Sequence, residues 1–254
     1  MGDISYGLQD KVAVVTGGSR GIGYALAKEL LAQGAFVAIC GRKKENLDAA
    51  AVSLGGGARL IAVAAHVAKE ADVENLFDRT FKAFGRIDIL VNNVGMNLLT
   101  TSVADTDPSL WNKILESNLT GTYLCSRKAA LLMRERKSGK IVNISSTAGR
   151  QASPGMGVYG IAKAGIEMLT RVMAMELAAA NIQVNAVAPG LVRTEFSKYF
   201  WANEELCRMI VKDIPAGKIA ETGDVVHPTL FLCSAYADYI TGQTVLVDGG
   251  ASVV

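Results

Sequence analysis

Near its start the chain has a short apolar segment, residues 11–16, that runs directly into a glycine-rich turn. The turn reads Thr16-Gly17-Gly18-Ser19-Arg20-Gly21-Ile22-Gly23, and apolar residues at helical spacing follow it, so a helix is predicted over 21–33. An apolar strand that passes through such a turn into a helix is typical of a buried parallel sheet, because parallel strands need a crossover helix. If the same order of strand, turn and helix repeats, the whole chain is expected to form such a sheet.

The alternation of strand and helix does continue along the chain. Further strands are predicted at 36–40, 58–63, 87–92, 140–144, 182–188 and 244–248, and further helices at 45–54, 69–84, 108–136 and 158–179. Apolar strands separated by helices indicate a parallel sheet that is covered on both faces. We therefore predict an α/β fold with a single Rossmann-like, doubly wound, parallel sheet of seven strands and helices on both faces.

The chain is predicted to form one domain over residues 1–254, because no linker and no repeat interrupts the alternation. The segment from 193 to 215 lacks the strand and helix pattern and contains Phe196, Tyr199, Phe200 and Trp201. We expect this segment to be a substrate lid. Its aromatic side chains fit an apolar pocket wall, and they fit an interface or a core stripe equally well.

The first turn has the properties of a phosphate site. Gly17, Gly21 and Gly23 let the backbone approach a pyrophosphate that lies over the unpaired amides at the start of the helix. The sequence therefore predicts a dinucleotide site. The Gly-x-Ser-x-Gly pattern of the same turn also occurs in serine hydrolases, where it normally follows several earlier strands. Here the turn follows the first strand, and His66 and His227 are the only histidines. Both observations argue against a serine hydrolase.

The end of the second strand indicates which dinucleotide is bound. The chain reads Cys40-Gly41-Arg42-Lys43-Lys44, where many NAD-binding folds have an acidic residue. Three cations close to a helix start are unfavourable unless an anion lies there. Arg42, with Arg20 from the glycine turn, is therefore predicted to bind the 2′-phosphate of NADP(H).

Tyr159 and Lys163 stand four residues apart in a predicted helix, so they share one helix face. A free phenol has a pKa of about 10, and a nearby ammonium group favours the phenolate. Together with a dinucleotide turn, this pair predicts a nicotinamide-dependent redox enzyme in which Tyr159 exchanges a proton.

Several motifs occur together in one order: the glycine turn, Asn92-Asn93-Val94-Gly95, Asn118, Ser146, Tyr159 with Lys163, and Pro189-Gly190 with Thr194. In this order the chain resembles the short-chain dehydrogenase/reductase family, and 3-oxoacyl carrier-protein reductases and related ketoreductases in particular, over essentially its full length. The resemblance implies that Tyr159 is the general acid-base and that Lys163 lowers its pKa and holds the nicotinamide ribose. It also implies that Ser146 orients the substrate carbonyl and that Asn118 holds a relay water.

The predicted cofactor-binding residues come from five parts of the chain: Gly17, Ser19, Arg20, Gly21, Ile22, Gly23, Arg42, Asn92, Val94, Gly95, Tyr159, Lys163, Pro189, Gly190, Val192 and Thr194. By resemblance, 92–95 lies on the adenosine side and 189–194 contacts the nicotinamide. His66 departs from the family, because similar enzymes generally have an aspartate there to accept a hydrogen bond from adenine. A contact from His66 to adenine is left open.

The predicted activity is therefore NADP(H)-dependent interconversion of a ketone and a secondary alcohol. The same residues also occur in dehydratases and epimerases, and the fold alone fits a non-catalytic nucleotide-binding protein. Lys137 matches one of two basic positions that hold an acyl carrier, but Ala180 occupies the other, so a free ketone or alcohol, an acyl carrier and a coenzyme A thioester stay open.

Charge and composition exclude several classes of binding partner. A net charge of +2 without a long basic run gives no basis for binding nucleic acid, and the four scattered cysteines form no metal motif. No apolar run is long enough for a membrane span, and the first residues contain no export signal, so a cytoplasmic protein is expected. Excess apolar residues on the two longest helices, together with the family resemblance, predict a homotetramer.

Overall fold

The computed structural model describes residues 4–253 and has, over that range, one parallel sheet of seven strands. The strands are β1 (Val12–Thr16), β2 (Phe36–Gly41), β3 (Leu60–Ala64), β4 (Ile89–Asn92), β5 (Gly139–Ile144), β6 (Ile182–Pro189) and β7 (Thr244–Val247). Their order in the sheet is β3-β2-β1-β4-β5-β6-β7, and the register is parallel throughout. The predicted α/β class and the seven-stranded, doubly wound sheet are confirmed.

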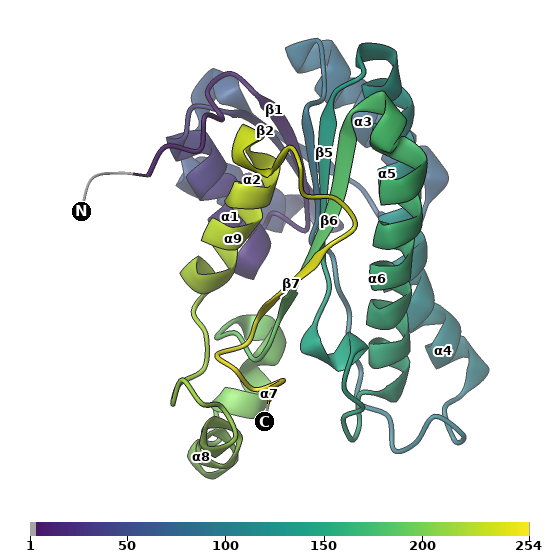
Figure 1. Cartoon of the computed structure of the whole chain (residues 1–254), viewed down its shortest axis with the longest axis vertical. Coiled ribbons are helices and arrows are strands. Elements are labelled where there is room, and N and C mark those ends of the chain that lie inside the picture. Colours follow the sequence, from purple (N-terminus) through teal and green to yellow (C-terminus); the bar gives the residue numbers. More distant parts are fainter. Residues whose placement is uncertain (1–3, 254) are drawn as a thin grey trace.

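Helices cover both faces of the sheet (Figure 1). One face packs against α1 (Gly21–Ala32), α2 (Lys44–Leu54) and α9 (Thr222–Cys233), and the other against α3 (Glu70–Phe84), α5 (Gly121–Arg136) and α6 (Gly157–Leu177). Short 3-10 turns join some elements: η1 (Gly57–Arg59), η3 (Thr147–Gly149), η4 (Ala178–Ala180), η5 (Glu195–Ser197) and η6 (Ala235–Ala237). The strand β1 is buried along its whole length, which explains its nearly continuous apolar sequence. β5 and β6 are also buried throughout, although each contains two polar or charged residues.

The helix predicted over 108–136 is divided into three parts. α4 (Pro108–Leu115) leads into a π-helical turn, η2 (Glu116–Thr120), before α5 begins. The side-chain amide of Asn118 donates a hydrogen bond of 2.8 Å to the carbonyl oxygen of Ile114, one turn earlier. Such turns widen a helix locally and are frequent at functional sites.

The segment 190–243 is more regular than the sequence predicted. It contains α9, which was not predicted, and the expected lid over 193–215 includes two short helices, α7 (Lys198–Trp201) and α8 (Glu204–Lys212). α9 was missed because Pro228 lies inside it, where proline normally removes a helix hydrogen bond. Tertiary packing of Val225, Val226 and Leu230 in the core stabilises the helix despite this cost.

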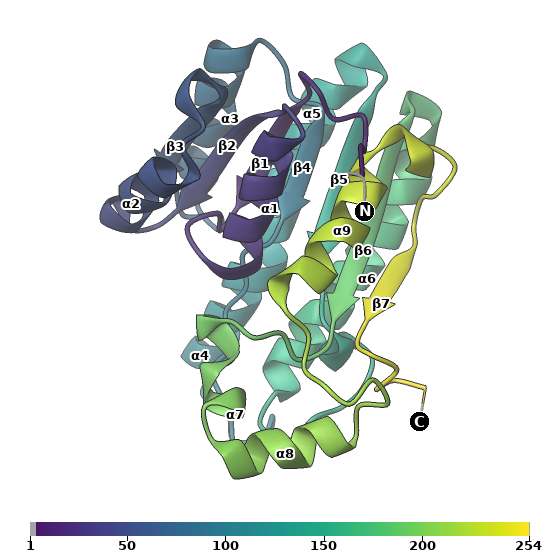
Figure 2. The same ribbon diagram turned by 90° about the vertical axis from the view of Figure 1, so that its left-hand side faces the viewer.

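The short helices α7 and α8 of this segment lie beyond the carboxyl ends of the strands (Figure 2). The start of the segment is held to the rest of the protein by Arg193, which pairs with Glu221 at 3.0 Å. Within the segment, the Trp201 indole donates a hydrogen bond of 3.0 Å to the Thr194 carbonyl oxygen. At the other end, the Ala216 amide bonds to the Gly249 carbonyl. Over residues 4–253, no helix is both long and apolar enough to cross a membrane.

Candidate active site

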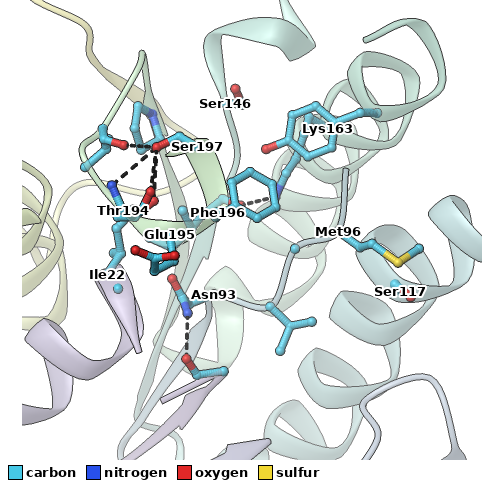
Figure 3. A pocket seen from close by; sticks show the side chains of 18 of the residues that line it. Ile22, Asn93, Met96, Ser117, Ser146, Lys163, Thr194, Glu195, Phe196 and Ser197 are labelled. Atoms are coloured by element: carbon cyan, nitrogen blue, oxygen red, sulfur yellow. Dashed lines mark hydrogen bonds between the residues drawn. The ribbon is translucent and has the colours of Figure 1, made fainter. Parts of the chain in front are cut away.

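A cavity of about 730 Å³ lies at the carboxyl ends of the strands, where ligands bind in doubly wound sheets. Its wall is formed by the turn after β1, the ends of β2 and β3, the loops after β4, β5 and β6, α6, and the 193–215 segment. Figure 3 shows part of this wall, from Ile22 to Lys163 and Phe196. The fold therefore brings together predicted site residues that are separated by more than half of the chain.

The glycine-rich turn forms one end of the cavity. Gly17, Ser19, Arg20, Gly21 and Ile22 line it, and α1 begins at Gly21. Gly17 and Gly21 have φ values of +68° and +56°, which favour glycine. The amides at the start of α1 thus face a space that an anion can enter.

Gly23 contributes to this turn in a different way. It does not line the cavity, and a Cβ atom at this position would lie only 2.4 Å from the Gly17 carbonyl oxygen. Gly23 therefore allows α1 to pack closely under the turn, and its effect on a ligand is indirect.

Asn93 is a site residue that the sequence reasoning did not single out. Its side-chain amide donates hydrogen bonds of 3.0 Å to the Thr16 carbonyl and 3.3 Å to the Gly17 carbonyl, so it fixes the glycine turn from below. The signal was present in the Asn92-Asn93 pair, but the role was given to Asn92. Asn92 is buried beneath the cavity and its side-chain amide bonds to Ser126 and Asn143, both at 2.8 Å. Val94 and Gly95, the next two residues, do line the cavity.

Positive charge gathers at the end of β2. Arg42 and Lys43 line the cavity there with Arg20, whereas Lys44 is paired with Asp48 at 2.6 Å and lies outside the wall. His66 lines the same region. Its Nδ1 atom accepts a hydrogen bond of 3.2 Å from the Ala68 amide, so the neutral ring carries its proton on Nε2.

Tyr159 and Lys163 lie in the first two turns of α6, next to Ser146 from the loop after β5, and all three line the cavity. The Nζ atom of Lys163 is 5.5 Å from the centre of the Tyr159 ring. Both side chains are almost completely buried, at 6% and 2% exposure for Tyr159 and Lys163.

Burial controls the protonation of both groups. It raises the pKa of Tyr159 to about 12, against which hydrogen bonding with Ser146 acts in the lowering direction. It also lowers the pKa of Lys163 to about 7, because a charged ammonium group loses its hydration there. Desolvation of the phenolate is thus the larger effect on the pKa of Tyr159 here, and the lowering of this pKa by Lys163 that the family resemblance implies stays a prediction.

Asn118 lies behind the cavity wall and is fully buried. Its side chain holds the loop after β4 at both polar atoms: Oδ1 accepts from the Met96 amide at 3.2 Å, and Nδ2 donates to the Met96 carbonyl at 2.8 Å. A Cβ atom on Gly95 would lie 3.4 Å from the Asn118 amide oxygen and 3.6 Å from Lys163 Nζ. A side chain at Gly95 would therefore contact both Asn118 and Lys163.

The turn after β6 closes the cavity on the side of the 193–215 segment. Pro189, Gly190, Val192 and Thr194, which are predicted to contact the nicotinamide, all line it. A Cβ atom on Gly190 would be 3.1 Å from the Cβ of Asp248, so this turn packs tightly against the end of β7.

Apolar residues surround the end of the cavity at which Tyr159 lies. The Phe196 ring centre is 6.2 Å from that of Tyr159, and Met96 and Met156 pack on the small core cluster that contains Tyr159. The sequence had placed Phe196 and Phe200 on a pocket wall as one of several options, and both do line the cavity. Met96, Met156, Leu191 and Ile210 were missed, because isolated apolar residues in loops and short helices carry no distinctive signal.

Three comparisons with known proteins agree with this geometry. The family model described as enoyl-(acyl carrier protein) reductase matches residues 17–252. Human dehydrogenase/reductase SDR family member 4 is 38% identical over 244 residues, which cover 96% of this chain and 88% of that protein. The chain belongs to the short-chain dehydrogenase/reductase family.

A solved structure and a second human relative lead to the same family. A short-chain type dehydrogenase/reductase from Mycobacterium ulcerans superposes with a TM-score of 0.93 at 30% identity, covering 98% of this chain and 92% of that one. Human dehydrogenase/reductase SDR family member 2, a relative described as mitochondrial, is 37% identical over 95% of this chain and 86% of its own length. Short-chain dehydrogenases/reductases are oxidoreductases that use NAD or NADP.

The residues present fit such a cofactor. The glycine turn, held by Asn93, leaves room for a pyrophosphate at the start of α1, and cations line the adjoining wall. Within residues 4–253, no three His, Cys, Asp or Glu side chains are grouped so as to hold a metal ion.

Proposed function

We propose that this short-chain dehydrogenase/reductase is an NADP(H)-dependent oxidoreductase that interconverts a ketone and a secondary alcohol. The observation that carries the proposal is the meeting of Ser146, Tyr159 and Lys163 at one end of the cavity whose other end is formed by the glycine turn. This geometry supports a role for Tyr159 as the proton donor to a carbonyl bound at that end of the cavity.

Each side chain has a distinct task in this reaction. The Tyr159 hydroxyl, protonated at neutral pH because burial raises its pKa to about 12, donates its proton to the carbonyl oxygen during reduction. Ser146 donates a hydrogen bond to the same oxygen and orients it, and Lys163 supports the tyrosine and the ribose. A bound nicotinamide supplies or accepts the hydride.

The preference for NADP(H) rests on Arg20, Arg42 and Lys43. A phosphate monoester on the ribose adds up to two negative charges, and arginine forks bind phosphate oxygens bidentately. These cations line the wall next to the glycine turn, and Asn46 is the remaining side chain from the start of α2 in that wall. Within the described residues, no acidic side chain from the end of β2 or the start of α2 lines the wall, and the acidic residue that does line it, Glu195, comes from the segment after β6.

The substrate end favours an apolar carbonyl compound. Phe196, Phe200, Met96 and Met156 present carbon surface, and burying such surface stabilises an apolar ligand by about 25 cal/mol per Å². We retain the lid interpretation for 193–215, because Phe196 contacts Tyr159 directly and comes from that segment.

The test is the change in nicotinamide absorbance with purified protein, with NADPH compared to NADH across ketones, quinones, 3-oxoacyl thioesters and enoyl thioesters. NADPH oxidation with a ketone, at a kcat/KM well above that with NADH, supports the proposal. Tight NADPH binding without oxidation would instead favour a binding role, and product formed without net cofactor consumption would indicate a dehydratase or an epimerase.

We also propose that the protein is a cytoplasmic homotetramer. Exposed apolar side chains on α5 and α6 give these helices a surface that favours burial: Tyr123, Leu131, Met168, Val172 and Met175. Light scattering at micromolar concentration should give four times the monomer mass, and a monomeric mass would reject the assembly. Cell fractionation tests the location.

A further inference from the structure

One buried carboxylate close to the candidate active site has no part in the mechanism described above. Glu167 lies on α6 one turn after Lys163 and is only 4% exposed. A carboxylate is costly to bury unless it is paired and hydrogen-bonded. Its partners therefore show what the protein gains from it.

Both partners of Glu167 flank the segment that carries Ser146. The Arg150 Nε atom donates hydrogen bonds of 2.9 and 3.3 Å to the two carboxylate oxygens. On the other side, the Ser145 hydroxyl lies within donating distance of Glu167 Oε1, at 3.3 Å, and of the Lys163 carbonyl, at 3.2 Å. Ser145 immediately precedes Ser146, and Arg150 follows it by one 3-10 turn, η3.

The segment between these two contacts packs against α6 with no space to spare. A Cβ atom on Gly149 would lie 2.9 Å from the Ala164 amide nitrogen, and a Cβ atom on Gly160 would lie 2.6 Å from the Ala148 carbonyl oxygen. Main-chain atoms of the loop and of the helix are thus in direct contact. The position of the loop along the α6 axis therefore depends on the contacts that fix its two ends.

We propose that Glu167 is a positioning residue, which holds both ends of the 145–150 loop on α6 and thereby sets the position of the Ser146 hydroxyl relative to Tyr159. The proposal rests on the proposed function, since it assigns Ser146 to the orientation of a carbonyl. Displacement of an orienting group by about 1 Å can cost a hundredfold in rate. The ion pair thus acts on turnover through Ser146, and it has no contact with the nucleotide end of the cavity.

The first experiment compares Glu167→Gln, Arg150→Met and the double variant with the wild type, with kcat, KM and the dissociation constant of NADPH measured for each. We expect each single variant to lose about tenfold in kcat and to keep its NADPH affinity within about twofold. The double variant should be no slower than either single variant, because both changes remove the same interaction. Arg150→Lys, which retains a cation, should recover part of the loss.

A matched control is an ion pair on β5, the strand that leads into Ser145 and Ser146. Lys140 of β5 forms a partly buried ion pair of 2.6 Å with Asp238, away from Ser146. Asp238→Asn should keep kcat within about twofold while it removes a pair of the same type. If Asp238→Asn slows turnover as much as Glu167→Gln does, the effect is one of general stability and the positioning role is wrong.

Amide hydrogen exchange over 145–151 tests the loop without any turnover. Glu167→Gln should increase exchange there, whereas Asp238→Asn should not. Unchanged exchange in Glu167→Gln overturns the proposal, and so does faster exchange with an unchanged kcat. If the wild type turns over no carbonyl compound, the proposed function fails and the positioning of Ser146 for catalysis fails with it, while the exchange data still decide whether Glu167 holds the loop.

Discussion

The Nζ atom of Lys163 donates a hydrogen bond of 2.7 Å to the main-chain carbonyl oxygen of Ile144. Ile144 is the last residue of β5, and Ser146 follows two residues later. The bond therefore joins the helix that carries Tyr159 to the strand that leads into Ser146. It also gives the buried Lys163 amine a hydrogen-bond acceptor, since no carboxylate forms an ion pair with this group within residues 4–253.

Replacing Tyr159 by phenylalanine should remove the proton donor and keep the cavity wall. We expect kcat to fall by a factor of about 10² to 10⁴, the usual contribution of general acid catalysis. NADPH affinity, measured by fluorescence, should stay within about twofold of that of the wild type. Tyr236→Phe, at an exposed position, is the control. Near-normal turnover in Tyr159→Phe would reject the mechanism.

The buried Lys163 predicts a specific dependence of stability on pH. Its pKa is about 7 in the folded protein and 10.5 in the unfolded chain, so between these values the unfolded state binds more protons. Stability from this group therefore increases as pH rises from 7 toward 10.5, and it is lost as pH falls through the same range.

The measurement compares urea unfolding of the wild type and Lys163→Met between pH 7 and pH 10. The wild type should gain on the variant by up to about 1.4 kcal/mol per pH unit. The raised pKa values of the buried Cys40 and Cys233 thiols affect both proteins equally and cancel in the difference. A difference that does not change with pH would show that Lys163 keeps its ordinary pKa.

Arg42→Asp should shift the cofactor preference from NADPH toward NADH. Loss of a charge-assisted hydrogen bond costs about 1.5–3 kcal/mol, so the ratio of kcat/KM values for NADPH and NADH should fall by at least about tenfold. Lys44→Ala provides the comparison, because Lys44 is a neighbouring cation that lies outside the cavity wall. If the ratio of kcat/KM values is unchanged in Arg42→Asp, Arg42 does not bind the 2′-phosphate.

Gly23→Ala should weaken NADPH binding although Gly23 does not line the cavity. The added Cβ would lie 2.4 Å from both the Gly17 carbonyl oxygen and the Asn93 amide nitrogen, so the turn has to shift. Overpacking of this kind costs about 1–3 kcal/mol in stability. Gly223→Ala, with no atom within 4 Å of the added Cβ, should bind NADPH normally. Equal affinities in the two variants would contradict a structural role for Gly23.

The strand and helix order could be predicted from the sequence because each signal is local. Apolar runs such as Val12–Thr16, glycine at the turn and helical apolar spacing depend only on neighbouring residues, and the predicted boundaries differ from those of the strands and main helices by no more than two residues. The exceptions were α9 and the break in the long helix at Asn118. In both, long-range packing or side-chain hydrogen bonding overrides the local preference.

For the site, the sequence determined which residue types are available, and only the tertiary structure decided where they act. Asn92, Asn118 and Gly23 were predicted at the site and lie behind the cavity wall, whereas Asn93 fixes the glycine turn. The direction of the shift in the pKa of Tyr159 also depended on the structure, because desolvation is determined by all the atoms that surround a group. Local sequence specifies the backbone pattern, but burial and hydrogen-bond partners come from segments that are distant in the chain.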